Sequence, residues 1–150
     1  MRTITISIAI AVILALAIFL LTTHKPSDTE KIRSLLTKLE QSIESKDLAE
    51  CMSCISKDYS DNQGNTYNSL WRLAISGIRT HSQLRIRINN PKIKIRGHQA
   101  TVEASLAAFS ISPSGESSYR HFDWVLLHLE KERKEWKITN SAGWQESLEY

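Results

Sequence analysis

The sequence predicts an α+β domain preceded by a membrane-spanning helix. Three observations support this reading of the chain. Residues 4–21 carry no charged side chain, apolar residues recur with helical spacing between residues 28 and 79, and alternation of period two dominates residues 84–144. Helices followed by a run of strands are typical of α+β domains. We expect an N-terminal transmembrane signal anchor at residues 1–23, a linker at 24–27 and the domain at 28–150.

The apolar run at residues 4–21 has nearly the length needed to span a bilayer, about 20 residues. The alternative is a cleaved signal peptide with Arg2 as its basic region. The small-residue pattern Ala15-Leu-Ala17 lies inside the run, and no polar region follows it there, which favours an uncleaved anchor. No Cys ends the run, which excludes lipoprotein attachment.

Two sequence features give opposite predictions for the orientation of this anchor in the membrane. Near the run, Arg2 precedes it and four cations follow it, so by count alone the domain would be cytoplasmic. The following cations, however, alternate with acidic residues in a predicted helix, and a two-residue tail before a hydrophobic run is typical of a signal anchor. We therefore expect a single-pass membrane protein with an extracytoplasmic, periplasmic domain.

Three helices are predicted before the strands. Ser27 and Glu30 form a capping box for the first helix, whose apolar face contains Ile32, Leu35, Leu36, Leu39 and Ile43. A short second helix begins near Asp47 and ends before the turn-forming residues 58–65. The third helix is predicted from Tyr67 to Arg79.

Four antiparallel strands are predicted after the helices. Residues 84–88 and 93–96 alternate apolar and cationic side chains, and Pro91 and the turn at 112–115 are expected between strands. Residues 100–111 and 119–130 are apolar on both faces, so both faces need cover. Trp136 opens the last strand, and we expect Trp124 and Trp136 to be packed in the core.

The order of these elements resembles the nuclear transport factor 2-like, or SnoaL-like, superfamily from about Asp28 to Trp144. The resemblance rests on the turn Asp58-Tyr-Ser-Asp61-Asn-Gln-Gly64 after a short helix, and on a meander closing with Trp136-Lys-Ile138 and Ala142-Gly-Trp144. It implies a curved sheet wrapped around the helices as a cone, with a pocket between them. The fold hosts both enzymes and binding modules, so it does not assign a function.

A carboxylate with a Tyr or His neighbour is the arrangement that proton transfer next to a carbonyl would need. Asp123, His121 and Tyr119 share one strand face at alternate positions. If that face lines the pocket, Asp123 is the candidate base. The alternative is that this face is solvent-exposed at the rim of the sheet.

Three aromatic residues are candidates for the ligand pocket: Tyr59, Trp71 and Trp124. Asp58 and Asp61 flank Tyr59, but acids in a turn containing Gly usually bind local backbone. Cys51 and Cys54 form a C-x-x-C pattern within a helix, without a second pair or a following His at finger spacing. We expect buried thiols, or a strained disulfide as the alternative, and no metal site or cofactor.

The segment from Arg72 to Arg96 contains seven cations and no acidic residue. It is expected to be a solvated or partner-facing surface, with anionic lipid headgroups as the alternative partner. Nucleic acid is not expected, because no aromatic residues alternate with the basic ones for base stacking.

These observations predict a non-enzymatic, membrane-anchored domain that binds a small apolar ligand or a protein partner. The alternative is an isomerase or cyclase that uses Asp123 as general base with His121 or Tyr119. The second apolar face of residues 100–111, with Ala107, Phe109 and Ile111, predicts a homodimer formed through the outer sheet face.

Overall fold

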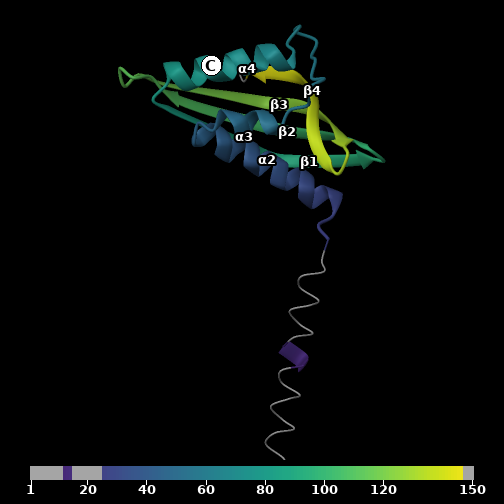
Figure 1. The fold of residues 1–150 in the computed structure, drawn as a ribbon. Helices are drawn as coiled ribbons and strands as arrows, with labels where there is room; N and C mark the ends of the chain where they lie inside the picture. The colour runs from purple at the N-terminus through teal and green to yellow at the C-terminus, as the bar shows by residue number, and fades with distance from the viewer. Residues whose placement is uncertain (1–11, 15–24, 147–150) are drawn as a thin grey trace, which may run out of the picture.

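The computed structural model describes residues 12–14 and 25–146 (Figure 1). From residue 25 onward these form one α+β domain, as the sequence predicts. The helices are α2 (Asp28–Glu44), α3 (Leu48–Ser53) and α4 (Tyr67–Thr80), and the strands are β1 (Gln83–Arg96), β2 (Gln99–Ile111), β3 (Ser117–Glu132) and β4 (Glu135–Glu146).

The three helices begin where their capping residues lie. Ser27 caps α2, and its hydroxyl and the Glu30 carboxylate form the predicted capping box. Asp47 caps α3 through the Glu50 amide, and Thr66 caps α4. The predicted helix positions are confirmed within a few residues. In α2, Ile32 and Leu36 are buried, which confirms the predicted apolar face.

The four strands form one antiparallel sheet in the order β1-β2-β3-β4, which confirms the predicted meander. The prediction for Pro91 was wrong, because this residue lies inside β1. The pairing of β1 with β2 shifts between Asn89 and Lys92, and Asn90 has a φ of 51°. A bulge on an edge strand accommodates proline, since no ladder hydrogen bond has to be donated there.

The sheet has an inner face that packs on the helices and an outer face without a described helix. On β2, the inner face contains Ala100, Val102, Ala104, Leu106 and Ala108, as predicted. On β3 the predicted alternation fails, because the register shifts near Phe122 and Trp124. This bulge puts Phe122 on the inner face with Val125 and Leu127.

The two tryptophans predicted for the core have different positions. Trp136 on β4 is 3% exposed and packs in the core with Ile138 and Leu129, which confirms the prediction. Trp124 is 41% exposed, so the prediction that it is packed was wrong. The bulge in β3 explains the difference, because it turns the Trp124 side chain away from the helices. The Trp124 ring instead lies against Gly143 of β4.

The two outer strands of the sheet have their free edges partly covered. On β1, the amide of Ile88 donates a hydrogen bond to the Glu40 carboxylate of α2. On β4, the amide of Ile138 donates to the Cys54 carbonyl, the Ser56 amide donates to the Ile138 carbonyl, and the Ser60 amide donates to the Thr139 carbonyl. The chain between α3 and α4 therefore runs along the edge of β4 (Figure 1).

The predicted membrane span at residues 4–21 lies outside the described residues, except for residues 12–14. In residues 12–14 and 25–146, no helix combines the length and the apolar character needed to cross a bilayer.

Candidate ligand cavity

An apolar cavity of about 360 Å³ lies between the inner face of the sheet and the three helices. Its volume falls within the range of small-molecule sites in proteins. Helix residues Leu39, Ile43, Cys51, Met52, Ile55, Leu70 and Ala74 and sheet residues Ile86, Ile88, Ala104, Leu106, Ala108, Phe122, Val125 and Leu127 line it.

The lining follows from the alternation of the strands and the spacing of the helices. Inner-face residues of β1, β2 and β3 form the floor, and small residues such as Ala104 and Ala108 leave space that larger side chains would fill. Helix α4 covers the cavity through Leu70 and Ala74, yet no residue of α4 is fully buried. Helix α4 and strand β1 are thus the two walls without a fully buried side chain.

Cys51 is the only titratable residue that lines this cavity. Burial raises the pKa of its thiol to about 11. The thiol is therefore protonated at neutral pH, where it behaves as a small apolar group and not as a nucleophile. The chemistry available to a ligand in this cavity is dispersion and desolvation.

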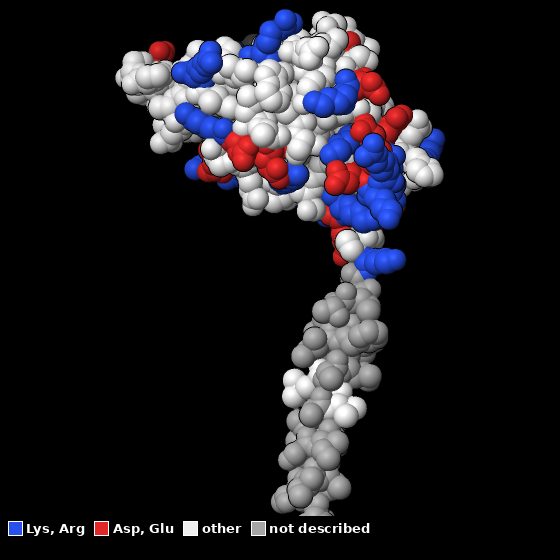
Figure 2. Space-filling model, viewed as in Figure 1, with Lys and Arg blue, Asp and Glu red and all other residues white. Residues whose placement is uncertain are grey.

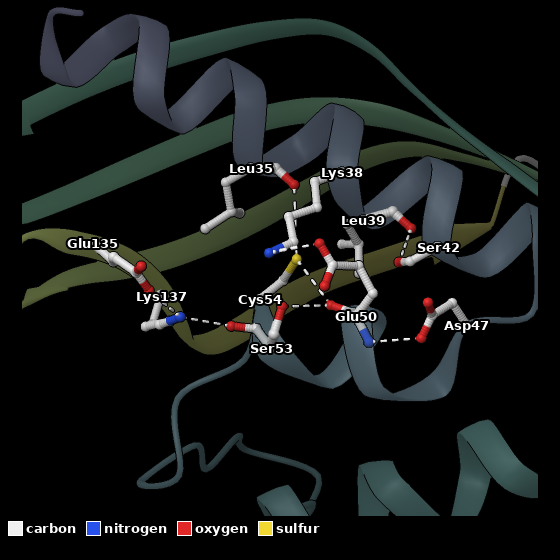
Figure 3. Close-up of polar contacts among 10 residues, drawn as sticks. All are labelled: Leu35, Lys38, Leu39, Ser42, Asp47, Glu50, Ser53, Cys54, Glu135 and Lys137. Atoms are coloured by element: carbon white, nitrogen blue, oxygen red, sulfur yellow. Dashed lines mark hydrogen bonds and ion pairs between the residues drawn. The ribbon is translucent and has the colours of Figure 1, made fainter. Parts of the chain in front are cut away.

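The Cys54 thiol lies next to Leu35 of α2 (Figure 3). Both cysteines are free thiols. The Cys54 Sγ lies 3.7 Å from the Glu50 carbonyl and 3.9 Å from the Leu35 carbonyl. Nearby, Lys38 and Glu50 form an ion pair of 2.8 Å, and Lys137 donates to the Ser53 carbonyl. The structure thus has two free thiols and not the alternative disulfide, and the predicted burial holds for Cys54, whereas Cys51 is half-buried.

The raised pKa of Cys51 leads to a specific expectation for its alkylation. Since the thiolate is the reactive species, the rate of reaction with iodoacetamide should keep rising from pH 9 to about pH 11. Mass spectrometry of the Cys51 peptide measures this rate, and Cys51→Ser isolates the contribution of Cys54. A plateau near pH 9 would show an ordinary, exposed thiol.

A second, mainly apolar hollow of about 280 Å³ adjoins the cavity and shares Leu39, Ile55, Leu70 and Leu127 with it. Tyr59, a predicted pocket residue, is 4% exposed and lines this hollow. Its hydroxyl donates to Asp61 at 3.0 Å and lies 2.7 Å from the Ser141 hydroxyl. Burial raises the pKa of Tyr59 to about 12.

The acidic residues beside Tyr59 have structural partners. Although burial opposes ionisation, hydrogen bonds from Asn65 lower the pKa of Asp61. The Asp61 carboxylate also accepts from the amide of Gln63. Asp58 is exposed. The turn is thus held by local hydrogen bonds, which was one of the two readings of the sequence.

The other two predicted pocket residues do not line the apolar cavity. Trp71 on α4 is half-buried and packs against Tyr67, with ring centroids 6.4 Å apart. Trp124 lies on the outer face of the sheet over Gly143. Tyr67 in turn packs under the ammonium group of Lys57 at 3.8 Å.

Asp123, His121 and Tyr119 also lie away from the cavity lining. His121 pairs with Ala107 and Tyr119 pairs with Phe109, on the outer face of the sheet. The Asp123 carboxylate is 69% exposed and lies 3.3 Å from the His121 Nε2. Tyr119 is 60% exposed. The geometry thus does not meet the condition under which Asp123 would be a base, namely a position facing the pocket.

The cations of the predicted basic segment are partly paired. Arg85 and Arg87 both contact the Glu44 carboxylate of α2, at 2.9 and 3.1 Å, and hydrogen bonding from Arg87 lowers the pKa of Glu44. Lys94 pairs with Glu103 at 3.0 Å. These acidic partners come from α2 and β2, so the sequence of the segment alone could not reveal them.

A further hollow of about 420 Å³, with walls that are about equally polar and apolar, lies on the sheet near the turn between β1 and β2. Cations, a carboxylate and hydroxyl groups line it together, including Lys94, Arg96, Thr101, His128 and Glu130. Its charges are mixed, so it selects no ligand by sign. Among the described residues, no group of three or more His, Cys, Asp or Glu side chains could hold a metal ion.

Most of the cavity lining was visible in the sequence only as predicted core. Ala104, Leu106 and Ala108 were assigned to one strand face, but nothing in their pattern distinguishes a wall from packed interior. The available signal was the repeated Ala on that face, since small side chains leave unfilled volume.

The sequence matches no protein-family model and no curated protein. Solved structures do share its architecture. A candidate calcium/calmodulin dependent protein kinase II association domain from Xanthomonas campestris has a TM-score of 0.68 and 11% identity, covering 83% of this chain and 91% of that chain. A candidate scytalone dehydratase from Novosphingobium aromaticivorans has a TM-score of 0.66 and 14% identity, covering 76% and 80%.

A third structure carries the superfamily's name. This nuclear transport factor 2-like superfamily protein from Salmonella enterica serovar Typhimurium has a TM-score of 0.63 and 14% identity, covering 79% of this chain and 94% of that chain. These similarities show that the domain has the nuclear transport factor 2-like, or SnoaL-like, fold, which confirms the resemblance seen in the sequence. Because the identities are low and the fold hosts many activities, the similarity shows the fold alone.

Proposed function

We propose that this protein is a membrane-anchored, non-enzymatic domain that binds a small apolar ligand in the cavity between its sheet and helices. The observation that carries this proposal is the composition of the lining, in which apolar side chains surround about 360 Å³ and Cys51 is the only titratable group. Such a site offers apolar area and no general acid or base near neutral pH. No cofactor is required.

The membrane part of the proposal is supported by the sequence of residues 4–21, which carry no charge. We propose that these residues remain as a single-pass anchor and that the domain lies on the extracytoplasmic side. Digestion of the domain by protease added to intact spheroplasts supports this orientation, and protection from the protease contradicts it.

The enzymatic alternative would use Asp123 with His121 or Tyr119. The His121 and Asp123 side chains lie together, but the Asp123 carboxylate is exposed, and neither of them nor Tyr119 lines the apolar cavity. An exposed carboxylate on the outer face lacks the shielded site next to a bound substrate that general-base catalysis needs. The arrangement favours binding over catalysis.

Adjacent alanines on β2 provide a matched test of ligand binding. Ala108 lines the cavity, whereas Ala107 pairs with Arg87 and His121 on the outer face. Ala108→Leu should fill part of the cavity and weaken naphthalene binding about 10-fold or more, a loss of about 1.4 kcal/mol. Ala107→Leu should leave binding unchanged.

The measurement is an NMR titration of the chain from Pro26 onward, which contains every helix and strand of the domain. Naphthalene should shift the amides of cavity residues in a saturable way in the unmodified chain and in Ala107→Leu. Equal binding by both variants, or no binding by the unmodified chain, would contradict the proposal.

We also propose that two copies pair through the outer face of the sheet. No described helix covers this face, and Tyr119 and Trp124 are exposed on it. Phe109 lies on the same face and pairs with Tyr119 on one side and with Arg85 on the other. Phe109→Glu should shift the molecule from dimer to monomer in sedimentation at micromolar concentration, with unchanged circular dichroism. A monomeric unmodified chain would rule out this interface.

A further inference from the structure

Three segments far apart in the sequence meet at one end of the domain. They are the start of α2, the turn between β1 and β2, and the turn between β3 and β4. The Lys131 amide donates to the His98 carbonyl at 2.8 Å, and the Lys131 ammonium contacts both Asp28 oxygens at 2.8 Å. We call residues 25–31, 96–99 and 131–135 the anchor-proximal end, because the chain enters the domain there (Figure 1).

The carboxylates at this end are largely engaged within the domain. Asp28 contacts Lys31 as well as Lys131, and hydrogen bonding from Lys131 lowers the pKa of Asp28. Glu30 belongs to the capping box of α2, and Glu135 pairs with Lys137 at 2.8 Å. Their negative charge is therefore offset locally.

The cations at the tips have no such partners. The side chains of Lys25, Arg96, Arg133 and Lys134 are exposed and make no hydrogen bond or ion pair with the described residues. Among the carboxylates of this end, only that of Glu132 likewise has no partner among the described residues. Figure 2 shows Lys and Arg gathered on the domain where α2 begins. This end therefore presents an excess of free positive charge.

The distance from this end to a bilayer is limited by the chain. Only residues 22–27 separate the apolar run from α2. An extended chain spans at most about 3.5 Å per residue, so these six residues reach about 20 Å. If residues 4–21 lie in a bilayer, the anchor-proximal end must stay near its surface.

We infer that the anchor-proximal end docks on anionic phospholipid headgroups through Arg96, Arg133 and Lys134. This inference rests on the proposed membrane anchor and adds a binding surface to it. Cations near an anionic membrane surface are attracted additively. Leu39 and Ile43, which line the cavity, lie in the C-terminal half of α2. The docked domain therefore holds its cavity on the side away from the bilayer.

The test uses the full-length chain in lipid nanodiscs that contain a nitroxide-labelled headgroup lipid. One set of discs contains phosphatidylcholine, and in the other set part of it is replaced by phosphatidylglycerol. Paramagnetic broadening of amides is compared between the turn at residues 97–99 and the turn at residues 113–115, which lies at the opposite end of the sheet. Broadening should concentrate at residues 97–99 in the anionic discs and weaken at high salt.

Paired charge variants show whether these particular cations act. Arg133→Gln/Lys134→Gln should lower the docking equilibrium constant about 30-fold, the loss expected for two cations at an anionic surface. Arg72→Gln/Arg79→Gln, which removes two exposed cations from α4, should leave docking unchanged.

The possible outcomes distinguish the docking surface from the membrane anchor. A chain that inserts in the discs but shows equal broadening at both turns, or equal effects of the two double variants, overturns the docking surface and leaves the anchor in place. A chain that does not associate with discs of either composition overturns the anchor and the docking together.

Discussion

Trp136→Ala should lower the free energy of unfolding by about 3 to 5 kcal/mol, the range for removing a large buried aromatic side chain. The Trp136 side chain is 3% exposed and packs with Ile138 and Leu129 of the core. Its removal leaves a cavity that the paired strands β3 and β4 cannot close by moving together. Because whole domains of this size are stable by only about 5 to 15 kcal/mol, this one change removes a large share.

Urea denaturation of the chain from Pro26 onward measures the loss, with tryptophan fluorescence and circular dichroism as independent probes. Trp71→Ala is the control, since Trp71 is half-buried on α4 and contacts Tyr67. It should cost less than about 2 kcal/mol. A loss below about 1 kcal/mol for Trp136→Ala would show that the residue is not part of the core.

Gly143→Ala should be the second costly change, at about 2 to 4 kcal/mol. Gly143 has a φ of 75°, which L-residues adopt at a cost of about 1 to 2 kcal/mol. A methyl group at this position would also overlap carbons Cε3 and Cζ3 of the Trp124 ring. The ring would have to leave its place on β4.

A double-mutant cycle separates these two contributions. In a Trp124→Ala background the overlap is gone, so Gly143→Ala should cost only the backbone strain, about 1 to 2 kcal/mol. Trp124→Ala alone should cost about 1 to 2 kcal/mol, because its side chain is 41% exposed. Equal costs of Gly143→Ala in both backgrounds would show that Trp124 does not rest on this glycine.

The fold could be predicted from the sequence because its local patterns agree with one another. The capping box at Ser27 and Glu30, the helical spacing in α2 and the alternation in β2 each indicate the observed element. The β3 bulge could not be predicted, since it inserts one residue between Phe122 and Val125 without a distinct signal and reverses the faces from Trp124 onward. Trp124 was therefore assigned to the wrong environment.

The site was harder to predict than the fold, for a physical reason. Residues that could do chemistry, such as Asp123 and His121, are recognisable by type, but the structure puts them on the outer face. The cavity lining instead consists almost entirely of apolar side chains, which no sequence motif distinguishes from ordinary core residues. An empty volume behind Ala104 and Ala108 depends on how α4 and α2 sit over the sheet, and short-range patterns do not encode that arrangement.

The covered edges of the sheet limit how these molecules can aggregate. An open edge strand is a template on which another copy can add its own strand, and repeated addition builds fibrils. Here the Ile88 amide on the edge of β1 already donates to the Glu40 carboxylate, and Pro91 interrupts the same strand. On the other side of the sheet, residues 54–60 form backbone hydrogen bonds with the edge of β4. Each edge is thus covered along part of its length, which hinders strand-by-strand addition at both sides of the sheet, while its outer face remains open to face-to-face contact.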